Sequence, residues 1–561
     1  MKIRHCFYLL LTILLACNTE DTTSVKSDEQ AQPLNVLWIV AEDLSNYIPS
    51  FGDSTIQTPH LSRLAAEGIC FDNFYTSAPV CAPARSSIAT GMYPTKIGSM
   101  HMRTGPWHAY DISSRIKDGK EPYALEGLKV YEAMPEPEVK MMSEYLRHAG
   151  YFCTNNSKKD YQFRYPLAAW DENNNKGHWR NRAEGQPFFS IFNLNVTHES
   201  RIWAKAKDSL WVDAALDVPV PPYLPDTEVG KTDVRRMYSN IKEMDHQVGE
   251  ILRQLEEDNL LDKTVIFWYS DHGGPLPRQK RMLYDSGIKV PLIVRFPDRA
   301  KSGTRNDEIF NFIDLAPTVL SLAGLEPPAH MDGKAFLGPH KQIDGRQYAF
   351  GAADRFDAQY DTNRSVRDKR YKLIRYYQPE KSMFLQVAYR EQMAIMQELH
   401  RLRKAGRLTP AQALWFRDTK PDFEFFDTAS DPHELNNLAD DPQYEEEIDR
   451  LNRALDGWIA YTGDRGLGDE IEYIKSIWPD YEQPQTATPT TSRQGGQLLV
   501  SCTTDGASIA WQKTAAGAEP NDRWELYKGG IPWTESDTLR IVAHRLGYLP
   551  AETLVLPPKP Q

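Results

Sequence analysis

Acidic side chains and a histidine directly follow two apolar runs of the sequence. Glu42 and Asp43 follow the first run, and Asp271 and His272 follow the second. In sheets covered by helices, ligands gather beyond the carboxyl ends of the strands. Three carboxylates and an imidazole from two strand ends predict a site for a hard cation. Taken alone, each pair is more often a surface acid or a helix cap.

A third segment places a cysteine at the start of an expected helix. Cys81 is followed by Pro83 and Arg85. Because proline favours the first turn of a helix, Cys81 should lie just before a helix N-terminus, where free N–H groups attract anions. Arg85 lies one turn further on and could contact the same anion. A buried structural thiol is the alternative interpretation of a lone cysteine.

The apolar runs predict an α/β fold that brings these residues together. Asn35–Val40, Pro187–Asn195 and Thr264–Tyr269 have the apolar character of strands buried on both faces. Apolar residues from Val234 to Leu255 recur at spacings of three and four, which predicts a long helix with one apolar face. We therefore expect a large, mostly parallel but mixed sheet that is flanked by helices.

The sequence changes character towards its C-terminal end. Roughly residues 365–478 are expected to form a smaller α+β subdomain at the end of the main domain. Residues 479–497 are rich in Pro, Thr, Gln and Gly and are predicted to be a linker. Short apolar runs separated by Asp-Gly and Gly-Gly pairs predict a small all-β module over residues 498–561.

The composition excludes several classes of protein. The 561 residues are 41% hydrophobic and 25% charged, which is the balance of a globular protein rather than of a disordered, collagen-like or coiled-coil chain. A net charge of −12 argues against general nucleic-acid binding, which needs a basic surface. Six cysteines are too few for a disulfide scaffold.

The first residues have the pattern of an export signal. Lys2 and Arg4 precede a short apolar run, and the segment ends Leu-Leu-Ala before Cys17, as in a bacterial lipobox. We expect residues 1–16 to be a lipoprotein signal peptide, Cys17 to carry lipid and residues 17–33 to be a polar tether. The protein would then be exported and anchored in the bacterial cell envelope, at the outer membrane. A plain signal peptide with an incidental cysteine is the alternative.

Cys81-x-Pro83-x-Arg85 resembles the signature of the type I sulfatases of the alkaline-phosphatase superfamily. Further segments match that family in the same order between about residues 35 and 463, and they include Glu42-Asp43, Asp271-His272, Lys280-x-x-x-Tyr284 and Asp314–Thr318. Met100–Arg103 is similar to the sulfamidase-like branch, which includes bacterial polysaccharide sulfatases. The resemblance implies that residues 34–478 form a sulfatase domain.

The resemblance also implies roles for individual residues. One Ca²⁺ would be held by Glu42, Asp43, Cys81, Asp271 and His272. Arg85, Lys158 and Lys280 would neutralise the sulfate group, and His198 would donate a proton to the leaving oxygen. Lys159 is the alternative to Lys158, and sulfate binding alone is the alternative role of His198. His101 and Arg103 could contact the substrate. The equally weighted alternative is that His101 is a turn residue and Arg103 a surface cation. The sequence departs from the family at several positions. Glu42 replaces its usual Asp, Asp160 stands where a histidine is common, and Ala89–Met92 replaces the usual Leu-Thr-Gly-Arg.

In this family the cysteine becomes formylglycine, through a formylglycine-generating enzyme or an anaerobic sulfatase-maturating enzyme. The hydrated aldehyde offers one hydroxyl to attack sulfur and a second to help expel sulfate. The implied substrate is a sulfated polysaccharide or its oligosaccharides, with an algal glycan such as ulvan favoured over glycosaminoglycans. Six bases in residues 158–182, with Arg278, Lys280 and Arg281, could form the rim of a cleft for such a polyanion. A solvated charged loop is the alternative interpretation of this segment.

Other interpretations remain open at the level of sequence. The last module resembles the small β domain at the C-terminus of some hexosaminidases, and we interpret it as a packing or spacing domain. A phosphodiesterase or phosphonate hydrolase of the same superfamily is an alternative enzyme. A non-catalytic, glycan-binding lipoprotein is an alternative of a different class.

Overall fold

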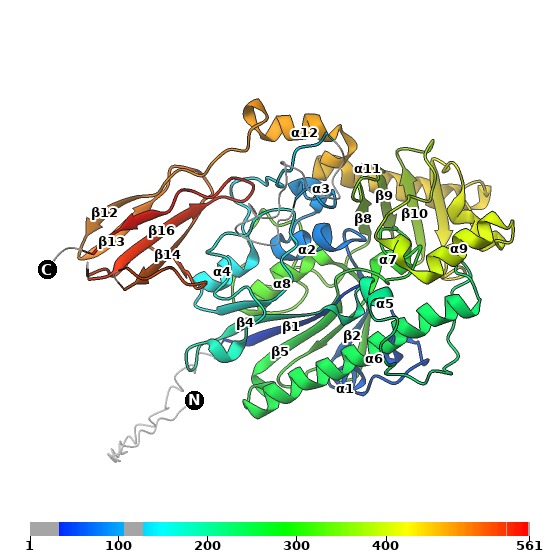
Figure 1. Ribbon diagram of the computed structural model, residues 1–561, viewed down its shortest axis with the longest axis horizontal. Coiled ribbons are helices and arrows are strands. Elements are labelled where there is room, and N and C mark those ends of the chain that lie inside the picture. Colours follow the sequence, from blue (N-terminus) through cyan, green and yellow to red (C-terminus); the bar gives the residue numbers. More distant parts are fainter. Residues whose placement is uncertain (1–32, 106–126, 516, 535, 559–561) are drawn as a thin grey trace, which may run out of the picture. The chain divides into compact units, whose positions relative to one another are not determined.

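A computed structural model describes residues 33–105, 127–515, 517–534 and 536–558 (Figure 1). The expected signal peptide, the lipidation site Cys17 and almost all of the tether lie outside the described residues. Among the helices of the described ranges, none combines the length and the apolar character needed to cross a membrane.

A seven-stranded sheet forms the centre of the described chain, in the order β3-β4-β1-β5-β6-β2-β7. Its strands are β1 (Asn35–Ala41), β2 (Ile69–Tyr75), β3 (Phe152–Asn156), β4 (Phe188–Leu194), β5 (Thr264–Ser270), β6 (Lys289–Arg295) and β7 (Thr304–Asn311). Neighbouring strands are parallel except where β6 pairs with β5 and β2. The predicted mostly parallel, mixed sheet is confirmed, and each of the three predicted strands lies in it.

Helices cover both faces of this sheet (Figure 1). On one face, α1 (Pro59–Glu67) and α6 (Glu228–Glu257) pack against residues such as Leu37 and Ile39 of β1. On the other face, α2 (Cys81–Thr90), α4 (Met142–His148) and α8 (Leu315–Leu322) pack against Val36 and Trp38. Because successive strand residues point to opposite faces, an apolar run such as β1 is buried on both sides. The predicted apolar stripe of α6 is buried against the sheet.

An antiparallel sheet follows the central one along the chain, in the order β11-β10-β9-β8. Its strands are β8 (Ala349–Ala353), β9 (Asn363–Arg367), β10 (Tyr371–Tyr376) and β11 (Phe423–Asp427). Leu451 and Leu455 of α11 (Glu445–Thr462) pack against it. The remaining helices are α3 (Pro94–Ile97), α5 (Ser200–Ala204), α7 (Asp285–Ile288), α9 (Ala394–Lys404), α10 (Pro410–Ala413) and α12 (Glu470–Ile477).

The C-terminal module consists of antiparallel strands, as expected (Figure 1). The strands are β12 (Thr490–Gln494), β13 (Gln497–Ser501), β14 (Ser508–Thr514), β15 (Glu525–Leu526), β16 (Thr538–His544) and β17 (Leu554–Leu556). β12 lies within the expected linker, because residues 490–494 pair with β13. The guanidinium group of Arg147 donates a hydrogen bond to the carbonyl oxygen of Trp524 at 2.7 Å, so the module contacts the main domain directly.

Candidate active site

The parallel pairing of β1 and β5 brings the two acidic strand ends together. Ala41 and Ser270 are aligned in register, so the residues after each strand are neighbours. The backbone N–H of Asp43 donates a hydrogen bond to Oδ1 of Asp271 at 3.1 Å. Nε2 of His272 lies 3.2 Å from Oδ1 of Asp43 and 3.7 Å from Oδ1 of Asp271. The juxtaposition predicted from the sequence is thus present in the structure.

Four side chains offer ligand atoms to a single point. One atom each from Asp43, Cys81, Asp271 and His272 lie within 4.8 Å of one another, and all four residues are buried. Burial raises the pKa of Asp43 to about 7 in spite of the nearby Lys280. Burial also acts to raise the pKa of Asp271, but His272 and Arg85 outweigh it and hold that pKa below its usual range. Because buried carboxylates need a positive partner, Asp43 and Asp271, with Glu42 beside Asp43, fit a hard divalent cation.

Cys81 is the first residue of α2 and faces the same cluster. Its Sγ lies 3.3 Å from Nε2 of His272. The helix begins at Cys81 itself, with Val80 in extended conformation before it, rather than just after Cys81 as expected. Burial raises the pKa of the Cys81 thiol, so an unmodified cysteine here would be protonated and a poor nucleophile. Cys81 also lines a cavity of about 180 Å³, which gives a substrate access to it.

Two lysines and a histidine surround this cavity. Nζ of Lys280 lies 2.8 Å from Oδ2 of Asp43 and 3.3 Å from Nε2 of His198. Nζ of Lys158 lies 3.5 Å from Oε2 of Glu42. Burial, with the positive charge of Lys280 beside it, holds the pKa of His198 well below its usual value. The cavity therefore offers fixed positive charge and a neutral imidazole to an anionic group.

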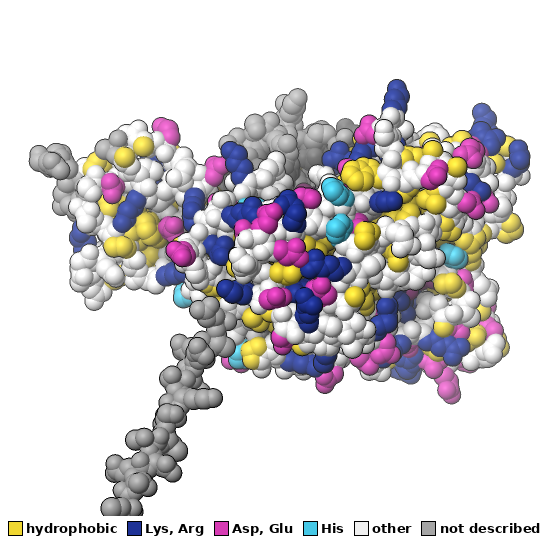
Figure 2. Space-filling view, turned by 90° about the horizontal axis from the view of Figure 1, so that it is seen from below, with side chains coloured by type: hydrophobic (Ala, Val, Ile, Leu, Met, Phe, Trp, Pro, Cys, Tyr) yellow, Lys and Arg dark blue, Asp and Glu magenta, His cyan; other side chains and the backbone are white. Residues whose placement is uncertain are grey.

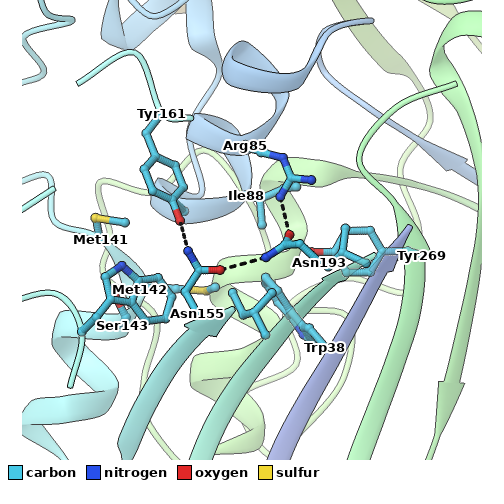
Figure 3. Close-up of a pocket in the computed structure, with 14 residues that line it drawn as sticks. Trp38, Arg85, Ile88, Met141, Met142, Ser143, Asn155, Tyr161, Asn193 and Tyr269 are labelled. Carbon is cyan, nitrogen blue, oxygen red and sulfur yellow. Dashed lines mark hydrogen bonds between the residues drawn. The ribbon is translucent and has the colours of Figure 1, made fainter. Parts of the chain in front are cut away.

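Arg85 is held in place by a carboxylate on one side and a chain of amides on the other. Its Nε and Nη2 donate to Oδ2 of Asp271 at 3.1 and 2.9 Å, and its Nη1 donates to Oδ1 of Asn193 at 2.6 Å. Nδ2 of Asn193 donates to Oδ1 of Asn155 at 2.9 Å, and Nδ2 of Asn155 lies 3.3 Å from the hydroxyl of Tyr161. Figure 3 shows this series of hydrogen bonds beside a small cavity.

The sequence interpretation did not identify several polar residues of the site. Glu199 accepts hydrogen bonds from Arg281 at 2.9 and 2.7 Å and lies 3.1 Å from Nζ of Lys280. Asp357 and Tyr389 also line the cavity. Glu199 directly follows His198, and this adjacency was the one signal that the sequence contained. Asp357 and Tyr389 come from distant loops and follow no motif.

The two weaker substrate candidates lie in different environments. Arg103 lines the cavity, where its Nε lies 2.6 Å from Oδ1 of Asp357. His101 is fully buried away from the cavity wall, 3.9 Å from Glu470, and its Nδ1 accepts a hydrogen bond from the backbone N–H of Arg355 at 3.4 Å. The structure thus places Arg103 beside the other site residues and His101 behind them.

The expected basic rim is smaller than the sequence suggested. Arg180 pairs with Asp258 at 2.7 Å, near the end of α6, and Arg278 donates to the backbone carbonyls of His433 and Glu434. Figure 2 shows a face on which basic and acidic side chains are interspersed. Of the expected rim, Lys158, Lys280 and Arg281 line the cavity at Cys81, where they can attract an anion.

Comparisons with known proteins agree with this geometry. A model of the Sulfatase family matches residues 34–151 and 148–325, and a model of the C-terminal region of N-sulphoglucosamine sulphohydrolase matches residues 278–402. An ulvan-active sulfatase of Formosa agariphila is 43% identical, and the match covers 97% of this chain and 96% of the relative. The human N-sulphoglucosamine sulphohydrolase is 24% identical over 78% of this chain and 91% of its own.

Solved structures share the fold. A 2-O GAG sulfatase superposes with a TM-score of 0.54 at 18% identity, and the match covers 77% of this chain and 93% of the other. A protein solved with D-glucosamine-2-N,6-O-disulfate gives a TM-score of 0.51 at 17% identity, over 78% of this chain and 100% of the other. Together with the family model and the full-length relative, the arrangement of Cys81, Arg85 and the buried carboxylates shows that the chain belongs to the sulfatase family of the alkaline-phosphatase superfamily.

Proposed function

We propose that this enzyme removes sulfate groups from ulvan or its oligosaccharides, with Cys81 converted to formylglycine and one Ca²⁺ bound beside it. The observation that carries the proposal is the position of Cys81, which starts α2 and lies 3.3 Å from His272 of the buried cluster. The ulvan-active relative, which aligns over nearly its whole length, supports this choice of polysaccharide.

The chain's own residues provide the cation site. Asp43, Asp271, His272 and residue 81 converge on one point, and Glu42 adds a carboxylate whose Oε1 lies 3.8 Å from Nη2 of Arg85. Carboxylate-rich donors of low softness favour Ca²⁺ over Zn²⁺. When bound, such a cation polarises sulfate oxygens and lowers the pKa of the attacking hydroxyl.

Hydrated formylglycine at position 81 supplies two hydroxyls on one carbon, one to attack sulfur and the other to help expel sulfate. Arg85, Lys158 and Lys280 place positive charge around that position and stabilise the charge that develops on the sulfate oxygens. His198 lies at the cavity wall, within 3.3 Å of Lys280. A sulfate group bound beside these two side chains would offset the charge of Lys280, raise the pKa of His198 and allow it to protonate the leaving oxygen.

The proposal extends to the protein's processing and location. Cleavage after residue 16 and lipidation of Cys17 would anchor the enzyme in the cell envelope, where large glycans are met. Conversion of Cys81 requires a formylglycine-generating or an anaerobic sulfatase-maturating enzyme in the host. Incorporation of labelled palmitate into the wild-type protein, and its loss in Cys17→Ala, tests the anchor.

Activity is tested on full-length protein produced with a maturation enzyme. Sulfate released from ulvan oligosaccharides is measured beside hydrolysis of an aryl sulfate and of a bis(aryl) phosphate. Release from ulvan supports the proposal. Hydrolysis of the phosphate diester in preference to both sulfates would assign the chain to phosphodiester chemistry instead. Binding of the oligosaccharide without turnover by fully converted protein would leave a glycan-binding role.

A further inference from the structure

A second cavity lies where the main domain meets the C-terminal module. Its volume is about 400 Å³, which falls in the range of about 300–1,000 Å³ of small-ligand sites. The main domain contributes Lys159, Tyr165, Leu167, Trp170, Asn173 and Asn174, and the module contributes Pro520, Asn521, Asp522, Trp524, Val542 and Thr553. Neither part forms this cavity alone.

The wall of this cavity combines aromatic rings with polar groups. Tyr165, Trp170 and Trp524 supply apolar surface, and Asn174 and Asp522 supply amide and carboxylate groups. A sugar ring presents both C–H faces and hydroxyls, so a mixed wall of this kind suits it.

Two buried donors in this wall lack partners. Nε1 of Trp170 and Nδ2 of Asn173 form no hydrogen bond with any described residue. Trp170 is only 5% exposed, and leaving a buried donor without a partner is unfavourable. Oδ1 of Asn173 is already used, because it accepts from Nδ2 of Asn155 at 3.0 Å, so its Nδ2 group has a fixed orientation. Both donors belong to side chains that line the cavity, and their hydrogen-bonding capacity is not used by the described residues.

One short segment contributes a residue to the second cavity and another to the cavity at Cys81. Lys158 lines the cavity at Cys81, and its neighbour Lys159 lines the second cavity. Asn155 donates to the carbonyl oxygen of Lys158 at 2.6 Å as well as to Asn173. Asn155 therefore holds one residue of each cavity, and a glycan that crosses this segment would meet both.

We propose that the second cavity binds a further pyranose unit of the same glycan chain whose sulfate lies at Cys81. The half-buried Lys159 would face a carboxylate or sulfate of that sugar, and Asp522 would accept hydrogen bonds from its hydroxyls. This inference depends on the proposed function and deepens it. The C-terminal module is then part of the substrate site rather than a spacer.

The test compares a long and a short substrate in full-length, converted enzyme. Lys159→Ala and Asp522→Ala are measured beside two matched controls, Lys263→Ala and Glu519→Ala, whose side chains are exposed and outside both cavities. The measured quantity is the ratio of KM for an ulvan tetrasaccharide to KM for an aryl sulfate. In each cavity variant this ratio should be about ten times that of the wild type. The controls should show the same KM ratio as the wild type.

Binding without turnover gives an independent readout. In a Cys81→Ala background, a chemically desulfated ulvan tetrasaccharide should change the tryptophan fluorescence, because Trp170 and Trp524 lie in the wall. Asp522→Ala should weaken this binding about tenfold. An unchanged KM ratio and unchanged binding in both cavity variants would overturn the second site, while ulvan desulfation by the wild type would leave the proposed function standing. Fully converted wild-type enzyme that is inactive on ulvan would instead overturn the proposed function.

Discussion

Arg85 and Asp271 form a buried pair in which two nitrogens of one guanidinium group bind the same carboxylate oxygen, at 3.1 and 2.9 Å. Both side chains are almost inaccessible to solvent. The pair fixes Arg85 one helical turn from Cys81. Together with His272, Arg85 outweighs burial and holds the pKa of Asp271 below its usual range. The same contact thus positions a side chain for the sulfate group and a carboxylate for the cation.

Replacing Arg85 with lysine should lower kcat/KM for an aryl sulfate by at least about 100-fold. A lysine keeps the charge but cannot bind Asp271 through two nitrogens and Asn193 through a third. Steady-state kinetics on fully converted enzyme measures the loss, with mass spectrometry confirming that conversion is unchanged. A variant within twofold of wild type would show that the fork geometry is not required.

Asn193 is expected to be a positioning residue for Arg85 and for the segment that carries Lys158. Asn193→Ala removes both its acceptor and its donor, and kcat should fall on the order of tenfold to a hundredfold. Asn193→Asp keeps an acceptor for Arg85 and loses the donor to Asn155, so it should recover much of the kcat for an aryl sulfate. Equal losses in the two variants, or loss of the folded state in both, would contradict this division of roles.

Calcium should stabilise the wild-type enzyme through the buried carboxylates. At about 100 times its Kd, a cation that binds only the folded state adds about 2.7 kcal/mol to the free energy of unfolding. Asp43→Asn removes one buried negative charge and should abolish most of this gain. Urea unfolding with Ca²⁺ and with a chelator measures it in both proteins. A calcium effect of equal size in Asp43→Asn would place the cation elsewhere.

His101 should make stability depend on pH. Burial, reinforced by Arg355 and opposed by Glu470, lowers the pKa of His101 from 6.5 to about 4. Since the unfolded state takes up a proton first as the pH falls, this contribution is present above about pH 6.5 and is lost towards pH 4. The loss amounts to about 3 kcal/mol. His101→Gln should remove this pH dependence, which is measured by comparing the free energy of unfolding at pH 7 and at pH 4.5. The same variant should keep KM for the aryl sulfate within twofold of wild type. A large rise in KM without a stability change would instead assign His101 to the substrate.

Much of the fold and of the cation site is encoded in local patterns. Parallel strands end at a common edge of the sheet, so the sequence alone indicated that the acidic pairs after β1 and β5 lie together. The ion-pair partners of charged side chains in loops could not be predicted in this way. Arg180 pairs with Asp258, far along the chain, so its charge is used within the fold and not at a rim.

Features that depend on two distant segments were also missed. The Asn155–Asn193 contact joins two strand ends, and no spacing rule selects these two asparagines from the others in the chain. The second cavity requires the docking of the module, which was interpreted from its resemblance to a small β domain as a packing or spacing domain. Such sites are defined by tertiary contacts rather than by motifs.

The central claim is that Cys81 is converted to the nucleophile of a sulfatase. Peptide mass spectrometry on the tryptic fragment with Cys81, from protein produced with and without a maturation enzyme, tests it most directly, with sulfate release from ulvan oligosaccharides measured on the same samples. We expect the mass loss of a thiol replaced by an aldehyde only in the matured sample, and sulfate release in proportion to it. An unmodified thiol despite a competent maturation enzyme, or sulfate release that is independent of conversion, would contradict the account.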